Sequence, residues 1–488
     1  MKELHDLELV LNSHTPIVAI ETIEEPRVLQ LFTRLAMRLG QPMFQWSVTE
    51  GLKRLEADFG AQKFTAEPEE ALKHIKVITQ PGFYVLLDFH PYLTDPMLVR
   101  LIKEIAQGYD SVPRTLVFLS HSIDIPPEIR HLTARFSLQL PKRSDIKRLI
   151  QEEAERWKNQ TRRKVKADPS AVERLANNLT GVTVTDARRL IRSAITKDGA
   201  ITQSDIPDLM KAKYELIGQD GVIAFEYDTA NFNEVAGLQR LKAWLKQRQG
   251  AFEGKQQNLQ QPKGIMLLGI QGGGKSLAAK AVAGTFSIPL LRLDFGALYN
   301  KFYGETEKNL RSALEIAETM APCVLWMDEI EKGVASGHSD DGLSQRVLGT
   351  LLTWMAENSS VFIVATANDI ERLPPELLRK GRLDEIFFVD LPGTEVRKDI
   401  FEIHLRRRNL APSGFDMDTL TMASEGFTGA EIEQAVVSAL YTAHANEASL
   451  DNEHLLEELA QTSPLSVVMS EKIQDLRGWA ANRTVSAD

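Results

Sequence analysis

The chain has 488 residues, 43% of them hydrophobic and 25% charged, a balance typical of globular proteins, and its length predicts two to four domains. Its net charge of -10 argues against a nucleic-acid partner, because general nucleic-acid binders carry clustered lysines and arginines. The single cysteine, Cys323, excludes an intramolecular disulfide and a thiolate zinc site, and no apolar stretch reaches the length of about 18 residues that predicts a membrane span.

Residues 1–215 predict an α/β body to about residue 140, followed by helices to about residue 215. The apolar runs PIVAIE (16–21) and FYVLLD (83–88) are typical of inner strands, and LTGVTVTDARRLIRSAI (179–195) is typical of a helix. Residues 216–231 show no clear periodicity and hold Gly218 and Gly221 close together, which predicts a linker.

Residues 264–283, GIMLLGIQGGGKSLAAKAVA, give the strongest signal in the chain. A short apolar strand leads into GIQGGGKS, which fits the P-loop pattern G-x-x-x-x-G-K-[ST], and a helix-forming segment follows. Such glycines let backbone N–H groups surround phosphate oxygens at a helix N-terminus. We therefore predict that Lys275 reaches the β- and γ-phosphates of ATP and that Ser276 ligates Mg²⁺. The residues predicted to surround the phosphates are Gly269, Gly272, Gly273, Gly274, Lys275, Ser276 and Leu277.

Two further strands bring polar side chains to the same site. VLWMDE (324–329) ends in two acids, of which Asp328 is predicted to hold the Mg²⁺ shell and Glu329 to polarise the attacking water. VFIVATAN (361–368) ends in Asn368.

With these motifs in this order, the segment from Phe232 to about Leu440 resembles the AAA family of ring ATPases. The resemblance implies a three-layer α/β core over residues 232–394, a helical lid over 395–465 and a C-terminal helix over 466–488. It implies that Asn368 senses the γ-phosphate. The residues that it places beside the adenine, the ribose or the lid face of the nucleotide are Ala236, His404, Gly429 and Ala430.

Some positions depart from the family pattern. Ile270 and Gln271 stand where the family usually has two prolines, and Gly273 and Ser276 stand where it usually has threonine. Neither change removes a phosphate donor or the hydroxyl, although three successive glycines predict a looser loop before nucleotide binds.

The segment RKGR (379–382) carries an inference about assembly. Arg379 and Arg382 match the paired arginine fingers of the family, which stabilise charge on the γ-phosphate. They follow the sensing strand, on the far side of the sheet from the P-loop, so we expect them to complete a neighbour's site. The resemblance implies a homo-oligomeric ring, usually a hexamer.

The segment NKFYGETE (300–307) places two large rings among polar residues. In AAA unfoldases this position is the loop that lines the central pore, and Lys301, Phe302, Tyr303 and Gly304 fit its pattern. Aromatic rings there can grip an extended polypeptide with little sequence preference. The alternative is that the rings pack between subunits or on the other domain.

Segments of the first half of the chain align with segments of the second half, but the first half lacks the residues that bind and hydrolyse nucleotide. LTGVTVTDARRLIRSAI aligns with SEGFTGAEIEQAVVSAL (424–440), and PIVAIETIEEPRVL aligns with the P-loop segment. We therefore predict a degenerate AAA-like domain over residues 1–215 with its own helical lid. Its loop places Glu21, Glu24 and Glu25 at the phosphates and has no glycine, so we expect no nucleotide there. The alignment sets Asp88 against Asp328 and lets Phe89 replace the catalytic glutamate.

Over its whole length the chain resembles the AAA ATPases encoded by a conserved hypothetical reading frame of plastids and cyanobacteria, which implies a cytoplasmic or stromal setting. The leading hypothesis is a ring-forming, Mg²⁺-dependent ATP hydrolase that remodels or threads a protein client, alone or with an adaptor. The alternative is a regulatory switch or scaffold that assembles on ATP and threads nothing.

Overall fold

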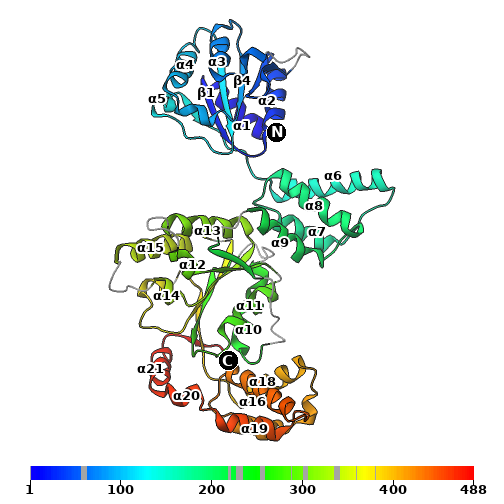
Figure 1. Ribbon diagram of the computed structural model, residues 1–488, viewed down its shortest axis with the longest axis vertical. Helices are drawn as coiled ribbons and strands as arrows, with labels where there is room; N and C mark the ends of the chain where they lie inside the picture. The colour runs from blue at the N-terminus through cyan, green and yellow to red at the C-terminus, as the bar shows by residue number, and fades with distance from the viewer. Residues whose placement is uncertain are drawn as a thin grey trace. The chain divides into compact units, whose positions relative to one another are not determined.

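The computed structural model of the chain describes residues 2–55, 63–217, 221–226, 235–252, 259–286, 288–300, 306–334, 341–358, 360–379 and 381–488. The chain divides into two compact units, Met1–Leu140 and Pro141–Asp488, and each contains a sheet with helices on both of its faces (Figure 1). Among the described residues, no helix is both long enough and apolar enough to cross a lipid bilayer.

Residues 1–140 form a six-stranded sheet in the order β3-β2-β4-β5-β1-β6, in which β3 alone is antiparallel to its neighbour. The inner strands β4 and β5 are buried along their whole length, as apolar runs predict. Helices α1 and α2 cover one face of the sheet, while α3, α4 and α5 cover the other. The strands are β1 (Ile17–Glu21), β2 (Met43–Ser47), β3 (Gly51–Arg54), β4 (Gly82–Leu87), β5 (Arg114–Ser120) and β6 (Thr133–Arg135). The helices are α1 (Lys2–Asn12), α2 (Glu25–Leu39), η1 (Lys63–Thr65), α3 (Pro68–Val77), η2 (His90–Thr94), α4 (Pro96–Gln107) and α5 (Pro127–Arg130).

Residues 221–488 contain a seven-stranded sheet in the order β15-β14-β10-β13-β12-β11-β9. Helices α10 and α11 cover one face, and α12 to α15 cover the other (Figure 1). The strands are β9 (Ile223–Glu226), β10 (Gly264–Gly269), β11 (Leu290–Leu293), β12 (Cys323–Met327), β13 (Val361–Ala367), β14 (Glu385–Val389) and β15 (Val485–Ser486). The helices are α10 (Gln239–Phe252), α11 (Lys275–Phe286), α12 (Phe295–Asn300), α13 (Thr306–Met320), α14 (Ile330–Val334), α15 (Asp341–Glu357) and η4 (Pro375–Leu378).

The two sheets share one topology. The central parallel strands run β6-β1-β5-β4-β2 in the first unit and β14-β10-β13-β12-β11 in the second, so strands of the same rank in sequence occupy the same place. This confirms the predicted fold class, an AAA-type α/β core preceded by a second α/β domain of the same type.

The helices that follow the first sheet belong to the second unit. They are α6 (Arg143–Thr161), α7 (Pro169–Asn178), α8 (Val184–Asp198) and α9 (Asp205–Ile217), with a short parallel pair of strands, β7 (Lys166–Ala167) and β8 (Ala200–Ile201). Their apolar side chains share one continuous core with α13 and the ATPase sheet. Residues 141–217, which we predicted to be the lid of the first domain, therefore pack on the second domain, because their apolar surface is buried there.

A buried lysine marks this junction. Lys213 of α9 is fully buried and donates to the backbone carbonyls of Asn178, Thr180 and Thr319 at 2.8, 2.7 and 2.6 Å. Gly181, with φ of +84°, lies so close that a Cβ there would be 2.5 Å from the Thr319 oxygen. The end of α13 is thus held by both residues.

The segment that we predicted to be a linker, 216–231, contains part of the sheet. Its residues Ile223–Glu226 form β9, which pairs antiparallel with β11 as an edge strand. Val222 and Ile223 are buried, so these apolar side chains are drawn into the core.

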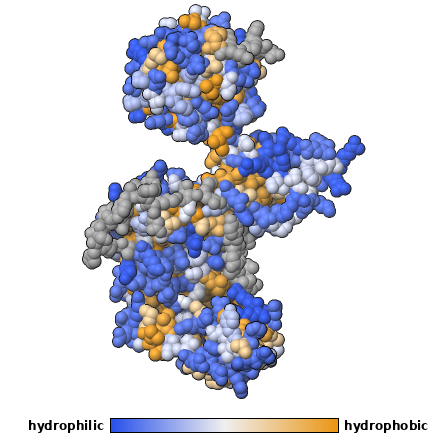
Figure 2. All heavy atoms as spheres, viewed as in Figure 1, coloured by the Kyte–Doolittle hydropathy of each residue, from blue (hydrophilic) through white to orange (hydrophobic). Residues whose placement is uncertain are grey.

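The helical lid and the C-terminal segment complete the second unit. The lid consists of α16 (Thr394–Arg407), η5 (Pro412–Gly414), α17 (Met417–Ala423), α18 (Gly429–Ala445) and α19 (Asn452–Gln461), around a core of its own. The predicted C-terminal helix over 466–488 is two helices and a strand, namely α20 (Leu465–Val468), α21 (Ser470–Ala480) and β15. In Figure 2, apolar side chains gather on the surface over α20 and α21, where Val467 and Val468 are exposed.

Candidate nucleotide site

The P-loop lies between a buried strand and a buried helix. Strand β10 is buried throughout, five residues (270–274) follow it, and α11 begins at Lys275. Gly269 has φ of +157° and packs so tightly that a Cβ there would be 2.0 Å from the Val389 oxygen. Only glycine fits this approach, and the loop consequently turns at a fixed point on the sheet.

Lys275 places a positive charge at the base of this loop. Its Nζ donates to the carbonyls of Gly269 and Ile270 at 2.9 and 2.8 Å, and the residue is 6% exposed. Burial lowers the pKa of Lys275 to about 8, against the opposing effect of nearby acids, of which Glu331 is the strongest. The ammonium therefore stays charged at neutral pH and lies within a cluster of carboxylates.

The two acids after β12 are held by β13. Thr366 donates to Asp328 Oδ1 at 2.6 Å and accepts from the Glu329 backbone N–H at 3.0 Å. Asn368 Nδ2 donates to Glu329 Oε1 at 3.0 Å, so the two residues predicted to act on water are in direct contact. Glu329 has φ of +47°, a backbone conformation that is uncommon for a residue other than glycine.

Further polar residues at this site were not predicted from the sequence. They include Thr366, Glu331, Arg407 and Asp488. Glu331 is 3% exposed and accepts from the Asn368 backbone N–H at 3.0 Å, and burial raises the pKa of its carboxyl. The acid two positions after Glu329 was a visible signal for Glu331. Asp488 gave no signal, because only the pairing of β15 with β14 brings it to the cavity.

The lid touches the P-loop directly. The Ala430 backbone N–H, in the first turn of α18, donates to the Gly272 carbonyl at 3.3 Å. Gly272 has φ of +76°, and a Cβ there would lie 2.9 Å from Thr428 Oγ1. Thr428 and Glu431 form a capping box at the start of α18, which fixes the helix end against the loop.

These elements enclose a cavity of about 460 Å³, the volume range of small-ligand sites. His404 of α16 lines it, is 9% exposed and lies 3.4 Å from a Glu433 carboxylate oxygen, and burial lowers the pKa of its imidazole. Of the residues predicted to contact nucleotide or Mg²⁺, the cavity brings together Ala236, Gly272, Gly273, Gly274, Lys275, Ser276, Leu277, Asp328, Glu329, Asn368, His404, Gly429 and Ala430. Gly269 lies at its base, bonded to Lys275.

The remaining predicted residues lie elsewhere. Arg379 is exposed and Arg382 donates to the Glu376 carbonyl, and neither lines the cavity of its own chain. Lys301, Phe302, Tyr303 and Gly304 lie outside the described residues.

The residues present also fit Mg²⁺. Ser276 and Asp328 line the same cavity and both offer oxygen, the ligand type that Mg²⁺ prefers. Thr366 holds one oxygen of Asp328 and orients the carboxylate toward the cavity side of the sheet edge.

The corresponding edge of the first sheet has no phosphate loop. Only residues 22–24 separate β1 from α2, compared with five residues after β10. Glu24 is 3% exposed and pairs with Arg27 at 2.7 Å, so it does not project toward a phosphate position as we predicted. Glu21 accepts from the Ile123 backbone N–H at 3.2 Å. Three residues without glycine are too short and too stiff to wrap a phosphate chain.

The structure also corrects the register of this edge. Val85 and Trp326 pair with Val117 and Val364 on the neighbouring strands, and each set lies on the face covered by the helix that follows the first strand. Counting on from these residues places Leu87 at the position of Asp328 and Asp88 at the position of Glu329.

Backbone conformation supports the same register, because Asp88 and Glu329 have φ of +49° and +47°. Our prediction that Asp88 matches Asp328 and that Phe89 replaces the glutamate was therefore wrong by one residue. By the same count His121 takes the place of Asn368, and Phe89 is a fully buried core residue. The prediction had matched the first acidic residue after each apolar run, whereas the strand pairings place these two acids one position apart.

Comparisons with known proteins agree with this division of the chain. Residues 265–391 match the family model of the ATPase family associated with various cellular activities (AAA). Residues 3–138 match the N-terminal domain and residues 144–220 the second domain of SpoVK-like AAA ATPases.

Full-length relatives decide the family. The AAA domain-containing protein ycf46 of Trieres chinensis is 34% identical over 491 residues, which cover 99% of this chain and 97% of that protein. The chain belongs to the ycf46 family of AAA-domain proteins. The ycf46 protein of Pyropia yezoensis is likewise 34% identical, over 496 residues that cover 99% of this chain and 98% of the relative. A more distant relative, the proteasome-activating nucleotidase of Aeropyrum pernix, is 37% identical over 190 residues, or 37% of this chain and 46% of that protein. As an AAA ATPase, this member of the ycf46 family binds ATP and is an ATP hydrolase.

Proposed function

We propose that this chain is the subunit of a homo-oligomeric ring, a hexamer in the simplest case, that hydrolyses Mg²⁺-ATP in order to remodel a protein partner. The observation that carries the hydrolytic part is the 3.0 Å contact between Asn368 and Glu329 at a cavity that also contains Lys275. A base, an amide that orients it and a phosphate-binding cation are thereby brought to one site.

Each group has a separate task in this proposal. Lys275 and the N–H groups of residues 272–276 hold the phosphates, and Lys275 neutralises charge on the β- and γ-phosphates. Glu329 accepts a proton from the attacking water, and Asn368 keeps the carboxylate in position. Ser276 and Asp328 hold Mg²⁺, which when bound neutralises negative charge on the phosphate oxygens.

A Glu329→Gln variant tests this assignment. Glutamine keeps the shape and can still contact Asn368, but it cannot accept a proton, so phosphate release should fall 10²-fold or more while ATP binding persists. Glu315→Gln, an exposed change on α13, is the matched control and should hydrolyse ATP at the wild-type rate. A Glu329→Gln chain that hydrolyses ATP as fast as the wild type would refute the assignment.

The arginines support assembly as part of catalysis. Arg379 and Arg382 do not line the cavity of their own chain, although Arg407 does, so we assign them to the γ-phosphate of a neighbouring subunit. Mixed rings test this directly. Arg382→Ala and Glu329→Gln chains should each be nearly inactive alone, and mixing them should restore part of the activity at sites that receive Glu329 from one chain and Arg382 from the other.

The surface over α20 and α21 supports the same ring. Val467 and Val468 are 68% and 69% exposed, and a neighbouring subunit is one partner that would cover them.

Remodelling of a protein is supported by the resemblance of the segment Lys301–Gly304 to a pore loop and by a relative named as an activator of the proteasome. The Glu329→Gln chain should retain a bound client, alone or with an adaptor, and so allow its recovery. Phe302→Ala should leave ring size and basal hydrolysis unchanged and abolish the work on that client. A Phe302→Ala ring that processes the client normally would contradict threading, whereas loss of the ring itself would indicate an interface role.

The likeness to the ycf46 proteins leads us to propose the cytoplasm or the plastid stroma as the compartment.

A further inference from the structure

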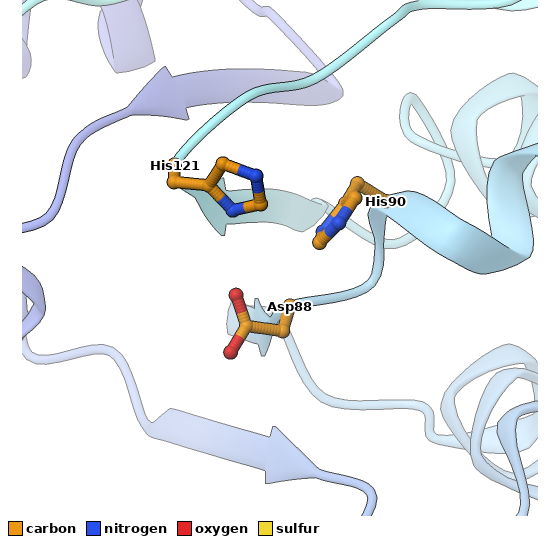
Figure 3. Close-up of side chains that lie close together, drawn as sticks. All are labelled: Asp88, His90 and His121. Atoms are coloured by element: carbon orange, nitrogen blue, oxygen red, sulfur yellow. The ribbon is translucent and has the colours of Figure 1, made fainter.

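Three residues with metal-ligating side chains meet at one edge of the first sheet. Asp88 follows β4, His90 begins η2, and His121 follows β5, so all three stand at the carboxyl ends of adjacent parallel strands. Each offers one ligand atom, and these atoms lie within 4.8 Å of one another. Figure 3 shows the carboxylate of Asp88 and the two imidazole rings around a common space.

This edge corresponds to the catalytic edge of the second sheet. Asp88 and His121 stand where the ATPase has Glu329 and Asn368, and Asp88 keeps the same left-handed backbone conformation. The loop that would hold phosphates is missing, so the edge has retained polar side chains in a strained arrangement without the means to bind nucleotide. These side chains are therefore available to a ligand of another kind.

A buried hydroxyl contacts two of the three residues, Asp88 and His90. Ser120, the last residue of β5, is 4% exposed, and its Oγ lies 3.1 Å from Asp88 Oδ1 and 2.7 Å from His90 Nδ1. Residues that ligate metals through histidine and aspartate are usually oriented by such a hydrogen bond. The rings of His90 and His121 stand nearly perpendicular, at 88°, with centroids 4.8 Å apart. Asp88 and His121 are exposed, which leaves the space open to solvent.

We propose that Asp88, His90 and His121 bind a divalent transition metal, with Zn²⁺ as the natural occupant and water as its fourth ligand. Two imidazoles and one carboxylate are a common protein ligand set for Zn²⁺, whereas Mg²⁺ and Ca²⁺ prefer oxygen alone. Tetrahedral bonds of about 2.1 Å separate ligand atoms by about 3.4 Å. The ligand atoms, which lie within 4.8 Å of one another, therefore approach to about 3.4 Å as they bind, and rotation of the exposed Asp88 and His121 side chains permits this. The negative charge of Asp88, with Glu25 near enough to interact with it, favours a cation at this position.

The site has a simple consequence for the unit of residues 1–140. Binding would fasten the segment after β4 to the segment after β5 and so stabilise the same edge that ATP stabilises in the second sheet. The first domain would thus remain a ligand-binding domain of the ring with the nucleotide replaced by a metal.

The test uses the full-length chain, stripped with a chelator and titrated with ZnCl₂ in a calorimeter, followed by dialysis and elemental analysis. Wild type should bind one Zn²⁺ at this site, and Co²⁺ added in its place should give the intense visible bands of a four-coordinate site. His121→Ala and Asp88→Asn should lose this binding event. Ser120→Ala should weaken it by about 10- to 100-fold without abolishing it, because it removes an orienting hydrogen bond and no ligand.

Two controls keep the result decisive. His131→Ala removes an exposed histidine from the same unit and should bind as the wild type does. Circular dichroism and ATP hydrolysis, measured on every variant, show that each remains folded. The proposal is overturned if the folded wild type binds no Zn²⁺, or if His121→Ala binds it with unchanged stoichiometry and affinity.

Discussion

The buried lysine at the junction of α9 and α13 predicts a pH-dependent difference in stability. Burial lowers the pKa of Lys213 to about 7 in the folded chain, from 10.5 for the free side chain. Between these values the unfolded chain binds more protons than the folded one, so folding becomes more favourable as the pH rises through this window. Lys213→Met keeps a side chain of similar size and cannot titrate, so it removes this dependence.

The size of the effect follows from the two pKa values. Between pH 7.5 and 9.5 the wild type should gain about 2–3 kcal/mol in its free energy of unfolding relative to Lys213→Met. For a cooperative unit of roughly 350 residues this corresponds to about 3 °C in the midpoint of thermal unfolding. Cys323 does not interfere, because burial raises the pKa of its thiol to about 12 and keeps it neutral throughout.

The measurement is the difference in midpoint between the wild type and Lys213→Met at several pH values, by differential scanning calorimetry. Lys211→Met, an exposed change on the same helix, controls for the loss of a lysine. The test is how the difference in midpoint changes with pH, and not its size at any one pH. Lys213→Met also leaves three carbonyls without their donor, which lowers its midpoint at every pH. A difference that stays constant from pH 7.5 to 9.5 would show that the three carbonyl oxygens keep the ammonium charged and that the argument from burial is wrong.

Three other predictions concern the two sheets. Gly272→Ala places a Cβ 2.9 Å from Thr428 Oγ1 at a φ of +76°, so ATP affinity should fall about 10-fold in a fluorescent-nucleotide titration, a strain of about 1–2 kcal/mol. Glu331→Ala leaves the Asn368 N–H without its acceptor, so kcat should fall about 10-fold with ATP affinity unchanged. Glu331→Gln should restore kcat, and equal loss of kcat in both variants would contradict a positioning role. Residues 1–140 expressed alone should fold and give no heat of binding with ATP, and measurable binding would contradict the reading of their loop.

The nucleotide site was accessible from the sequence because its motifs are local. The strand, loop and helix around Lys275 are contiguous, and the strands that carry Asp328 and Asn368 are apolar runs whose ends must meet at one edge of a parallel sheet. The shared order of the two sheets was also predictable, since each segment of the first half aligned with one of the second. Such predictions need only local pattern and the order of elements along the chain.

Features that depend on tertiary pairing were not predictable in this way. Strand β9 has four residues, too few for a periodic signal, and exists because the edge of β11 is available to it. Whether residues 141–217 pack on the first or the second sheet is decided by complementary apolar surfaces that no single segment shows. The register at Asp88 could not be set from the first acid after each apolar run, and only the strand pairings revealed it.

Strand β9 also determines how mechanical load enters the ATPase. The chain leaves α9 and within a few residues becomes the edge strand of the sheet, bonded to β11 over four residue pairs. Tension on α9 is therefore shared between its buried apolar contacts with α13 and a row of backbone hydrogen bonds between β9 and β11. Strand β11 lies beside β12, which carries Asp328 and Glu329 at its end, so a pull on the helices reaches the catalytic edge through two rigid strands. A force on α6 to α9 and a movement at the nucleotide site are thus mechanically connected through β9, β11 and β12.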